Sequence, residues 1–546
     1  MSVITPDTDV ILLKVPLEIS EDHQLTFANA TAQYNYFNGL PATSKKVFDQ
    51  FTYQRKDNTI RVPALVDDLY GYNYVMYRND NHSHKWFYAF ITDMSYVSDG
   101  VTAISIKTDV WQTWQFDLTY KATFVEREHV NDDTKGLHTL PENLQLGEYV
   151  INSKTNYAPD KTVKDTDNVV INWKFPIFFQ VTEYLSTYLP EADNYSNARE
   201  YNGIFSGLRY FACCSISDAK SIINSYAAAG KSDAIVSIFI APKEFLDGSV
   251  KLGTGTHIYI PDNTTGLTTL LASQTVTVPT KVDGYTPKNN KLFTYPYSYM
   301  YVTNNVGGEA EYRYEDFASN TPKFCIEGAL GQGCTTRLEP ISYKHYTADA
   351  EVYDYGLTGA KYPVCAWASD YYTNWMAQNA GNINTSLVTS VATRALGFEN
   401  ANLFGNTMGM AGNVIGAASS ILNTIAEVER AKIIPDQARG NANTSDMLLG
   451  SQHYFYVNCM SVRSEYAKII DDYFSMFGYK VNSVKTPNVF GRTNWNFVKT
   501  IGCYIEADIP QGDLAEIKSM FDKGITFWHN PTTFMDYSQS NAIVTP

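Results

Sequence analysis

The sequence predicts a mainly β protein whose C-terminal end forms an α+β unit. Aromatic residues make up 14% of the 546 residues, with 40 Tyr and 28 Phe, and this composition favours strands. Apolar and polar residues alternate along the N-terminal region, whereas the C-terminal region mixes this period with helical spacing. A chain of this length is expected to form about three or four domains.

A β-hairpin is the clearest element of the N-terminal region. Strand-like residues 85–92 and 101–110 flank the pair Asp99 and Gly100, and an Asp-Gly pair between alternating runs is typical of a hairpin turn. The apolar side of the second strand comprises Ile104, Ile106 and Val110.

Turn-rich, polar stretches divide the rest of the chain. They lie at 131–170 and near 276–290, and a short helix is expected at 217–228 among strands. We therefore expect five segments. They are a β domain at 1–130, β-rich regions at 131–290 and 291–383, a hydrophobic segment at 384–445 and an α+β domain at 446–546.

Two helices are expected in the C-terminal domain. The first ends at Gly478, and its apolar residues at helical spacing are Val462, Tyr466, Ile469, Ile470, Tyr473, Phe474 and Phe477. In the second, Asp513 and Glu516 predict an Asp variant of the capping box, and Gly524 ends the helix before a strand at 525–528. The apolar face of this second helix comprises Leu514, Ile517, Met520 and Phe521.

Residues 400–426 differ from the rest of the chain because they contain no charged residue. A helix of this length would span about 40 Å, enough to cross a hydrocarbon core of about 30 Å. Gly405 and Gly409, and then Gly412 and Gly416, place small residues four apart, which permits close helix packing in lipid. The glycines also suit a loop or a buried segment, so these alternatives stay open.

The apolar and glycine residues of this segment are the candidate membrane-active residues. They are Leu403, Phe404, Gly405, Met408, Gly409, Met410, Gly412, Val414, Ile415, Gly416, Ile421, Leu422 and Ile425. Glu427 and Glu429 follow directly, and protonation of carboxylates beside an apolar run lowers the cost of placing it in lipid. Acid-assisted release of the segment is therefore a hypothesis, with these two glutamates as pH-sensitive residues.

The net charge of −15 argues against a protein that grips nucleic acid, because binding to phosphates requires clustered Lys and Arg. It is compatible with DNA that passes an acidic wall without adhering. Seven cysteines without a CxxC pair indicate buried thiols in a protein that is assembled under reducing conditions. The first twenty residues lack a basic region and a long apolar core, so no signal peptide is expected.

No motif of a phosphate-binding loop, zinc protease, calcium loop or serine hydrolase occurs in the sequence, so we expect no enzyme activity, metal or cofactor. His82 and His84 form a pair without a second cluster, which indicates a polar turn. The run 126–129 (EREH) is a charged cluster, and a salt-bridge network at a strand end is the favoured interpretation.

Short motifs near both ends of the chain resemble one family. They are 33–38 (QYNYFN), 85–92 (KWFYAFIT), 109–116 (DVWQTWQF) and 127–130 (REHV), followed by 465–482, 485–488 (KTPN) and 513–529. In order and spacing they resemble the tail knob proteins of small short-tailed phages with protein-primed linear genomes (Salasmaviridae-like and Rountreeviridae-like). The middle of the chain, 150–365, resembles the family only loosely.

The resemblance implies a structural protein at the distal end of the virion tail, assembled in the host cytoplasm. Its tail-tube-like β domains would assemble into a ring or tube, with 1–130 as the N-terminal tube domain, 131–290 as a central knob region and 446–546 as an α+β domain associated with the tube. The implied partners are further copies in a homo-hexamer, other phage tail proteins, the host cell membrane, and phage double-stranded DNA that passes through the lumen without specific binding.

The resemblance also implies a role for 384–445 as a long hydrophobic loop. This membrane-active loop would plug the lumen, leave it on infection and penetrate the host membrane as a pore during DNA ejection. The sequence departs from the family in being less rich in glycine here, and Arg394 and Glu399 interrupt the apolar run. These departures bear on how much of the loop reaches lipid.

Two other functions compete with this interpretation. Tyrosine-rich loops in 150–365 suit a receptor-binding tail component that recognises host wall carbohydrate, although tyrosine also packs sheets and subunit interfaces. A wall-degrading hydrolase is the third alternative, and no motif supports it.

Overall fold

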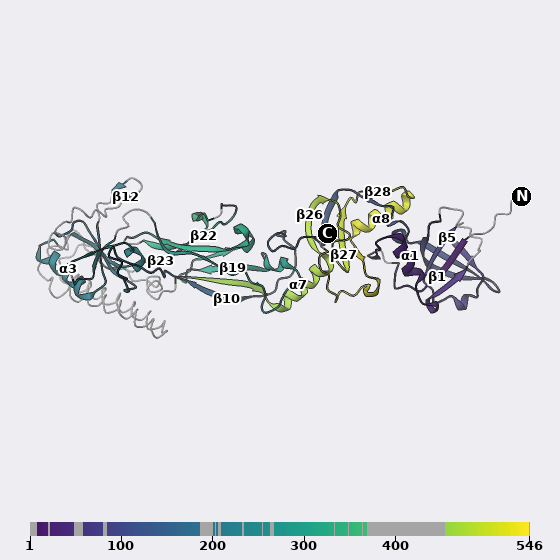
Figure 1. Cartoon of the computed structure of the whole chain (residues 1–546), viewed down its shortest axis with the longest axis horizontal. Coiled ribbons are helices and arrows are strands. Elements are labelled where there is room, and N and C mark those ends of the chain that lie inside the picture. Colours follow the sequence, from purple (N-terminus) through teal and green to yellow (C-terminus); the bar gives the residue numbers. More distant parts are fainter. Residues whose placement is uncertain are drawn as a thin grey trace. The chain divides into compact units, whose positions relative to one another are not determined.

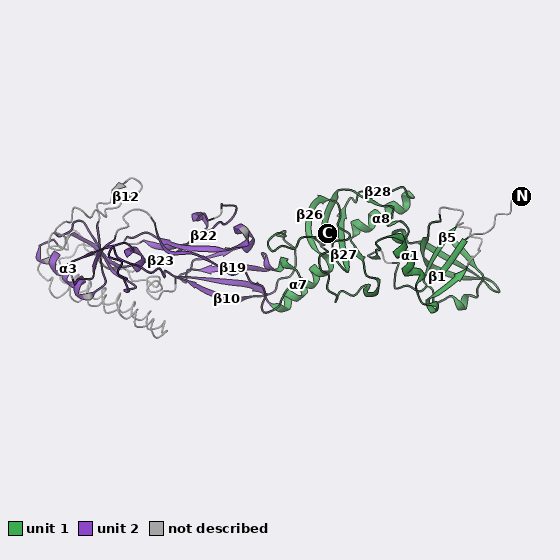
Figure 2. Ribbon diagram, viewed as in Figure 1, with its two compact units in different colours: residues 1–146, 285–292, 464–546 green, residues 147–284, 293–463 purple. Residues whose placement is uncertain are grey.

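The computed structural model describes most of the chain. The described residues are 8–19, 22–48, 58–79, 84–185, 200–201, 204–205, 209–231, 234–253, 255–261, 267–331, 334–347, 349–362, 364–367 and 454–544. The chain divides into two compact units (Figure 2). Unit 1 comprises 1–146, 285–292 and 464–546, and unit 2 comprises 147–284 and 293–463. The five predicted segment boundaries stay predictions.

A six-stranded antiparallel sheet forms the N-terminal part of unit 1 (Figure 1), in the order β3-β1-β5-β6-β7-β4. Alternate residues of its strands serve two separate cores, since Ile11 and Leu13 pack on one face and Val10 and Leu12 on the other. The strands are β1 (Thr8–Leu13), β3 (Lys45–Phe48), β4 (Thr59–Val62), β5 (Tyr74–Asn79), β6 (Phe87–Ser98) and β7 (Val101–Thr108).

The predicted hairpin is confirmed, because β6 and β7 pair antiparallel around Asp99 and Gly100. The expected length of its second strand is wrong. The strand ends at Thr108, and Val110 begins helix α2 (Val110–Trp114). Asp109 causes the change, because its carboxylate accepts the Gln112 N–H at 3.0 Å and caps the helix.

The second sheet of unit 1 joins the two ends of the chain. Its order is β2-β29-β27-β9-β26, with β2 and β29 parallel and the other pairs antiparallel. The strands are β2 (His23–Leu25), β9 (Thr123–Glu128), β26 (Tyr479–Lys485), β27 (Trp495–Ile501) and β29 (Ile525–Trp528), beside the small pair β8 (Thr119–Tyr120) and β28 (Ile505–Glu506). The helices of unit 1 are α1 (Ala30–Asn38), α2, α7 (Ser464–Phe477) and α8 (Gln511–Lys523).

Helix α8 buries the four apolar residues predicted for it and ends at Gly524, where φ is 99°. The predicted capping box is wrong, because the N-cap position is Pro510 and no side chain caps the helix. Asp513 instead accepts the indole N–H of Trp114 at 2.8 Å, and Glu516 pairs with Lys107 at 2.9 Å. Both carboxylates therefore bond to residues that are distant in sequence and do not cap the helix.

Helix α7 begins later than the sequence suggests. Val462 lies in the preceding strand, and Ile469 is 68% exposed, whereas Ile470 and Phe474 are buried. The predicted end is confirmed at Gly478, whose φ is 64° and whose place a side chain could not take. A Cβ there would lie 2.2 Å from the carbonyl oxygen of Glu128.

The described residues of unit 2 form three larger sheets and one two-stranded pair. Two four-stranded sheets have the orders β10-β25-β19-β20 and β18-β21-β22-β23, and a six-stranded sheet has the order β16-β17-β14-β11-β15-β24. The first comprises β10 (Tyr149–Tyr157), β25 (Phe455–Val462), β19 (Ser298–Thr303) and β20 (Glu309–Tyr312). The second comprises β18 (Thr268–Thr275), β21 (Lys323–Gly328), β22 (Thr335–Ile341) and β23 (Leu357–Lys361).

Among the described residues of unit 2, helix α3 (Ile216–Ala228) lies close to the range predicted. The strands of the six-stranded sheet are β16 (Val250–Leu252), β17 (Ile258–Ile260), β14 (Arg209–Cys213), β11 (Ile177–Val181), β15 (Ile235–Ile240) and β24 (Val364–Trp367). The two-stranded pair is β12 (Glu200–Tyr201) and β13 (Ile204–Phe205). One aromatic-rich core, with Phe178, Tyr312 and Phe324 among its buried members, runs through the unit.

The predicted fold class, mainly β with a C-terminal α+β unit, is confirmed. Within the described ranges, no helix combines the length and apolarity needed to cross a membrane.

Short 3-10 helices also occur among the described residues. They are η1 (Ala42–Ser44), η2 (Val66–Asp68), η5 (Lys243–Leu246), η6 (Asn290–Phe293), η7 (Tyr314–Asp316), η8 (Ala318–Asn320), η9 (Tyr353–Tyr355) and η10 (Pro531–Thr533).

Candidate functional site

The candidate membrane-active residues of 400–426, with Glu427 and Glu429, lie outside the described residues. The strands on either side of the gap are described, and both belong to unit 2. Strand β24 pairs with β15, and β25 pairs with β10 and β19. Strand β24 is thus the edge strand of one sheet, and β25 lies in the interior of another.

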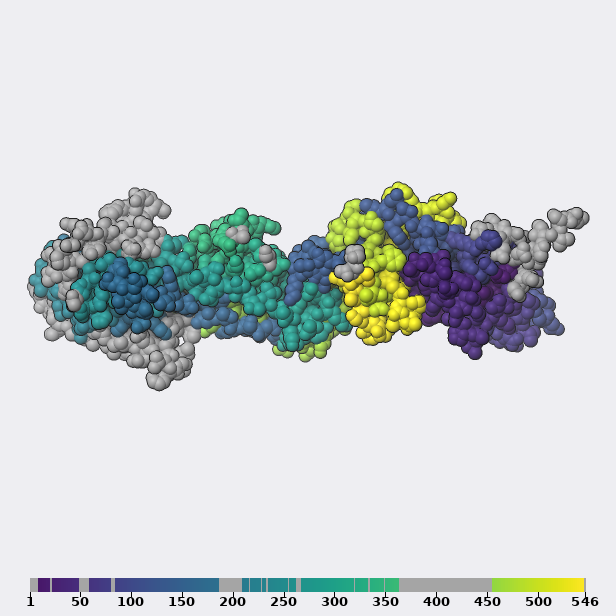
Figure 3. All heavy atoms as spheres, viewed as in Figure 1, coloured from purple at the N-terminus to yellow at the C-terminus, as the bar shows by residue number. Residues whose placement is uncertain are grey.

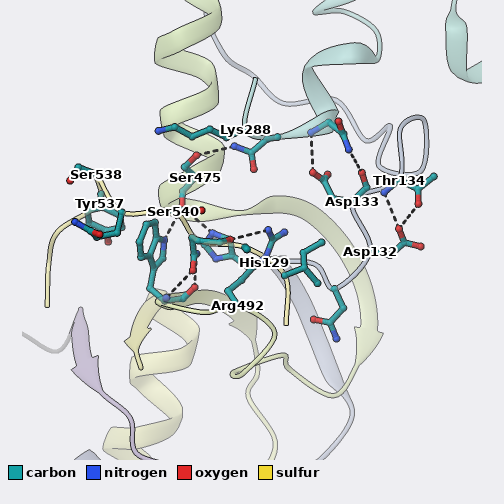
Figure 4. A pocket seen from close by; sticks show the side chains of 18 residues that line it. His129, Asp132, Asp133, Thr134, Lys288, Ser475, Arg492, Tyr537, Ser538 and Ser540 are labelled. Carbon is teal, nitrogen blue, oxygen red and sulfur yellow. Dashed lines mark hydrogen bonds between the residues drawn. The ribbon is translucent and has the colours of Figure 1, made fainter. Parts of the chain in front are cut away.

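A polar cavity of about 840 Å³ lies in unit 1 (Figure 4). Five stretches of chain that are distant in sequence line it: the residues after β9, the short segment before η6, the end of α7, the start of β27 and the C-terminal tail. The lining residues are His129, Asn131 to Thr134, Lys288 to Asn290, Ser475, Arg492, Trp495 and Tyr537 to Ile543.

His129 is held in one neutral form at the edge of this cavity. Its Nδ1 accepts the backbone N–H of Phe497 at 2.8 Å, so its Nε2 carries the proton and donates to the Ser475 carbonyl at 3.0 Å. Burial, followed by the nearby charge of Arg492, lowers the pKa of His129 to about 3. With both nitrogens engaged, this imidazole is a structural group and not a general base.

Arg492 lies in the middle of the lining (Figure 4) and is only 9% exposed. Its Nη2 donates to the Val130 carbonyl at 2.9 Å and its Nη1 to the Asn541 carbonyl at 3.4 Å. Its Nε is buried and has no hydrogen-bond partner among the described residues. Burial lowers the pKa of the guanidinium.

Acidic and amide groups form the opposite side of the cavity (Figure 4). Asp133 accepts the Tyr479 hydroxyl at 2.5 Å and the backbone N–H of Asn290 at 3.0 Å, and burial raises its pKa. Asp132 accepts the backbone N–H and the hydroxyl of Thr134 at 2.9 and 2.6 Å. Asp133 and Asp132 therefore each already accept hydrogen bonds from neighbouring residues.

The C-terminal tail is fastened along the start of β27. The Asn541 amide oxygen accepts the backbone N–H groups of Asn494 and Trp495 at 2.9 and 3.0 Å, and its amide nitrogen donates to the Trp495 carbonyl at 2.8 Å. The Thr493 N–H donates to the Ala542 carbonyl at 3.0 Å. These bonds fix the tail as a wall of the cavity.

A buried ionic cluster supports the same region. Glu142 pairs with Lys291 at 2.8 Å and with Arg127, and it also accepts the Lys480 N–H at 2.8 Å. Burial alone would raise the pKa of Glu142, but these donors and the two cations lower it. The predicted salt-bridge network in 126–129 is confirmed here, because Arg127 bonds Glu142 within a cluster that joins distant segments.

A second acidic anchor lies on α7. Asp471 is fully buried, and its carboxylate accepts the Tyr285 hydroxyl at 2.7 Å and the backbone N–H groups of Lys288 and Asn289 at 2.7 and 3.0 Å. The Asn289 amide adds a bond of 2.8 Å. This anchor positions the segment that carries Lys288 to the cavity.

A smaller cavity of about 420 Å³ lies in unit 2 and contains a different arrangement. Glu244 and Tyr454, 3% and 4% exposed, both line it. Burial raises the pKa of Glu244 to about 7, and the Tyr454 hydroxyl has no hydrogen-bond partner among the described residues. Tyr454 is the first described residue before β25.

Neither cavity is predicted by the sequence. Of their lining residues, only His129 belongs to a charged cluster in the sequence, the run 126–129. The polar tail 536–543 (DYSQSNAI) and the run 288–290 (KNN) are rich in hydrogen-bonding side chains, but nothing in the sequence shows that they meet. Within the described ranges, no group of three or more potential metal ligands occurs.

Comparisons with known proteins match the chain to phage tail proteins. The family model described as the C-terminal domain of the Bacillus phage phi29 tail knob protein gp9 matches residues 263–542, and the model of the caudoviral major tail protein N-terminus matches residues 7–119. The chain is 25% identical to the tail knob protein gp9 of Bacillus phage phi29, over 98% of each chain. It is 26% identical to that of Bacillus phage B103, also over 98% of each.

The fold is also similar to a solved structure, the tail knob protein gp12 of bacteriophage C1. The TM-score is 0.64 at 13% sequence identity, and the likeness covers 98% of this chain and 100% of the other.

Proposed function

This chain belongs to the tail knob protein family of phi29-like phages, and from this premise we propose that it forms the DNA-conducting tube of the distal tail as a homo-hexamer. Tail knob proteins are structural components of the virion tail, which assemble with other tail proteins and are not enzymes. The tube, the hexamer and assembly in the host cytoplasm are parts of the proposal.

In this proposal, residues 384–445 form a hydrophobic loop that plugs the lumen and is released on infection. The loops of the ring then penetrate the host membrane and open a pore through which the genome passes. The observation that carries this step is the absence of charge in residues 400–426, within a protein whose net charge is −15. A charged side chain in lipid costs several kcal/mol, so an uncharged segment of this length is suited to insertion.

The described strands beside the loop support the proposal. Because β24 and β25 are each paired within unit 2, the segment between them has both ends fastened to folded structure. The loop can therefore change its surroundings without unfolding either sheet. The acidic chain also suits a conduit, since repulsion of phosphates keeps DNA from adhering to the wall.

The test is release of a dye from liposomes by the purified full-length protein. We expect release by the intact protein and none by a variant that lacks 400–426, since both flanking strands remain in that variant. A variant in which the same residues are replaced by an equally long Gly/Ser segment controls for chain length. Equal release by all three proteins would contradict the proposal.

Phage particles that carry the deletion separate the conduit from an adsorption role. If such particles adsorb normally but deliver no DNA, the conduit is supported. If they fail to adsorb, recognition of host wall carbohydrate becomes the better function.

The acid-assisted release hypothesis has its own experiment. We expect Glu427 and Glu429 to favour insertion when protonated, so dye release should increase between pH 7.5 and pH 5. The double variant E427Q/E429Q should release dye equally at both values. A wild-type protein without pH dependence would contradict the hypothesis but not the conduit.

A further inference from the structure

Two buried glutamates are diagonal neighbours on the second four-stranded sheet of unit 2. In the pairing of β21 with β22, Cys325 lies opposite Glu339 and Glu327 lies opposite Arg337, so these side chains share one face of the sheet. Ile326, between them in sequence, belongs to the apolar core on the other face. Although they point away from this core, Glu339 is 1% exposed and Glu327 is 9% exposed.

A short turn, comprising η9 and Gly356, covers Glu339, and we call it the η9 turn (353–356). A Cβ added to Gly356 would lie 2.1 Å from Oε2 of Glu339, so the turn and the carboxylate are in close contact. The Tyr312 hydroxyl donates to the Tyr355 carbonyl and fastens the turn to β20. The green residues that follow β22 lie at the surface of unit 2 in the space-filling view (Figure 3). The turn is therefore a surface element that closes over a buried carboxylate.

The charges of the two carboxylates are poorly compensated. Oε2 of Glu327 and Oε2 of Glu339 are buried, and neither has a hydrogen-bond partner among the described residues. Arg337 Nε lies 2.9 Å from Oε1 of Glu339 but makes no hydrogen bond, and the Arg337 side chain is 37% exposed, so water screens this ion pair. Arg337 Nη2 donates instead to the Tyr353 carbonyl of the turn at 2.5 Å. A proton can neutralise a carboxylate oxygen that water does not reach.

The surrounding charges favour binding of such a proton. Burial raises the pKa of Glu339 to about 7, with Arg337 opposing the rise and Glu327 and Glu351 adding to it. Burial and Glu351 also raise the pKa of Glu327, against the effect of Arg337. Three carboxylates therefore share one guanidinium. The other titratable groups that face them, Cys325 of β21, Tyr312 of β20 and Tyr353 of the turn, have raised pKa values and are neutral at this pH.

We propose that the pair Glu327 and Glu339 forms a pH-sensitive switch with the η9 turn. A proton held by the pair keeps the turn closed, and loss of this proton to water opens the turn, so that both carboxylates become hydrated. The closed form is therefore complete in acid and is lost as pH rises through neutrality. Above that pH, unit 2 presents an acidic surface that the turn covers at lower pH. The switch lies outside the loop between β24 and β25, so it does not depend on the proposed function.

Hydrogen exchange in the full-length protein tests the switch. The readout is the protection of the turn amides, each measured rate being divided by the intrinsic rate at the same pH. Tyr355 and Gly356 are suited to this, because their N–H groups donate to the carbonyls of Val352 and Tyr353 at 3.1 and 3.2 Å. We expect protection to fall about tenfold or more between pH 5 and pH 8, since one unit of pKa difference changes the opening equilibrium tenfold. The amides of β22 should stay protected at both values.

Variants assign the pH dependence to the pair. Glu339→Gln keeps the shape of the side chain but cannot ionise, so the protection of the turn should become independent of pH. Glu327→Gln, which should weaken the dependence, is the second variant in case the first does not fold. Asp354→Asn removes an exposed carboxylate of the turn itself and is the matched control. Glu244→Gln removes the other carboxylate of unit 2 whose pKa is about 7. Both controls should keep the wild-type dependence.

Infrared spectra separate proton binding from a purely structural role of Glu339. A protonated carboxyl absorbs apart from a carboxylate, so the band of protonated carboxyls at pH 6 should be weaker in Glu339→Gln than in the wild type. This result, with a pH-dependent turn in the wild type and in both controls, supports the switch. Protection of the wild-type turn that does not change with pH overturns it. A wild-type dependence in both Glu339→Gln and Glu327→Gln, or an unchanged infrared band, also overturns it.

Discussion

Two buried glutamates, one in each unit, face opposite electrostatic surroundings. Glu142 of unit 1 has two cations and a backbone N–H, and these lower its pKa despite burial. Glu244 of unit 2 has no ion pair among the described residues, and burial raises its pKa to about 7. A buried glutamate is therefore ionised and joins chain segments in unit 1, whereas in unit 2 a buried glutamate binds a proton.

The difference follows from what each carboxylate joins. Glu142 connects Arg127, Lys291 and Lys480, which come from three distant parts of the chain. Unit 1 is assembled from such separate segments, so its buried charges act between them. In unit 2, Glu244 lines the smaller cavity, and no ion pair with a described residue offsets the burial of its carboxylate.

The largest expected effect comes from breaking the paired cluster. Glu142→Gln leaves Lys291 and Arg127 as buried cations without a full counter-charge, and we expect unit 1 to lose about 3–5 kcal/mol. Hydrogen exchange of the β9 and β26 amides in the full-length chain measures this. Glu506→Gln, at an exposed pair with Lys121, is the control, and an equal effect of both changes would contradict the comparison.

The next effect is a pH dependence in unit 2. Glu244 holds its proton up to a pKa of about 7 in the folded unit, against about 4.5 when unfolded. Stability from this group is therefore complete below pH 4.5 and lost as pH rises through 7, by about 2–3 kcal/mol. The loss of stability is measured by urea unfolding at pH 4.5 and at pH 8, with proteolysis reporting the unfolding of unit 2.

Glu244→Gln should remove most of this slope, whereas Glu311→Gln on the exposed side of β20 should keep it. A variant at 244 with the wild-type slope would show that another group titrates.

A smaller effect is expected at the acidic anchor of α7. Asp471→Asn places an amide NH₂ against backbone N–H donors and should cost about 1–3 kcal/mol. Hydrogen exchange of 285–289 reports it, because this segment donates the bonds. Asp472→Asn, next in sequence but exposed, should change exchange little. Loss of protection in both variants would point to a general effect on the helix.

The smallest effect is expected at Tyr454. Its buried hydroxyl has no hydrogen-bond partner among the described residues, so Tyr454→Phe should leave unit 2 unchanged or stabilise it by about 1 kcal/mol or less. The urea midpoint of unit 2 measures the change. A clear destabilisation would mean that the hydroxyl has a partner after all.

Local patterns in the sequence predicted local structure well. The hairpin at Asp99-Gly100 and the helix end at Gly478 depend on backbone conformations that few other residues adopt. One prediction failed because a distant partner intervened: Asp513 accepts the indole N–H of Trp114 and does not cap its helix. Another failed for a local reason, since Asp109 caps α2 and the strand ends before Val110.

The candidate sites divide in the same way. The uncharged segment 400–426 is visible in the sequence because absence of charge is a property of consecutive residues. The cavity around Arg492 is not visible in the sequence, since its walls come from five separated stretches. No local period records that Val130 and Asn541 will accept from the same guanidinium.

The sequence by itself determined the β-rich class, the hairpin, the C-terminal helices and the uncharged segment, because composition, periodicity and turn chemistry act over a few residues. Only the tertiary structure decided that β9 lies inside the C-terminal sheet and that Glu142 is paired while Glu244 is not. The reason is that burial and charge pairing depend on which distant segments meet, and these contacts set the pKa and the stabilising role of each side chain.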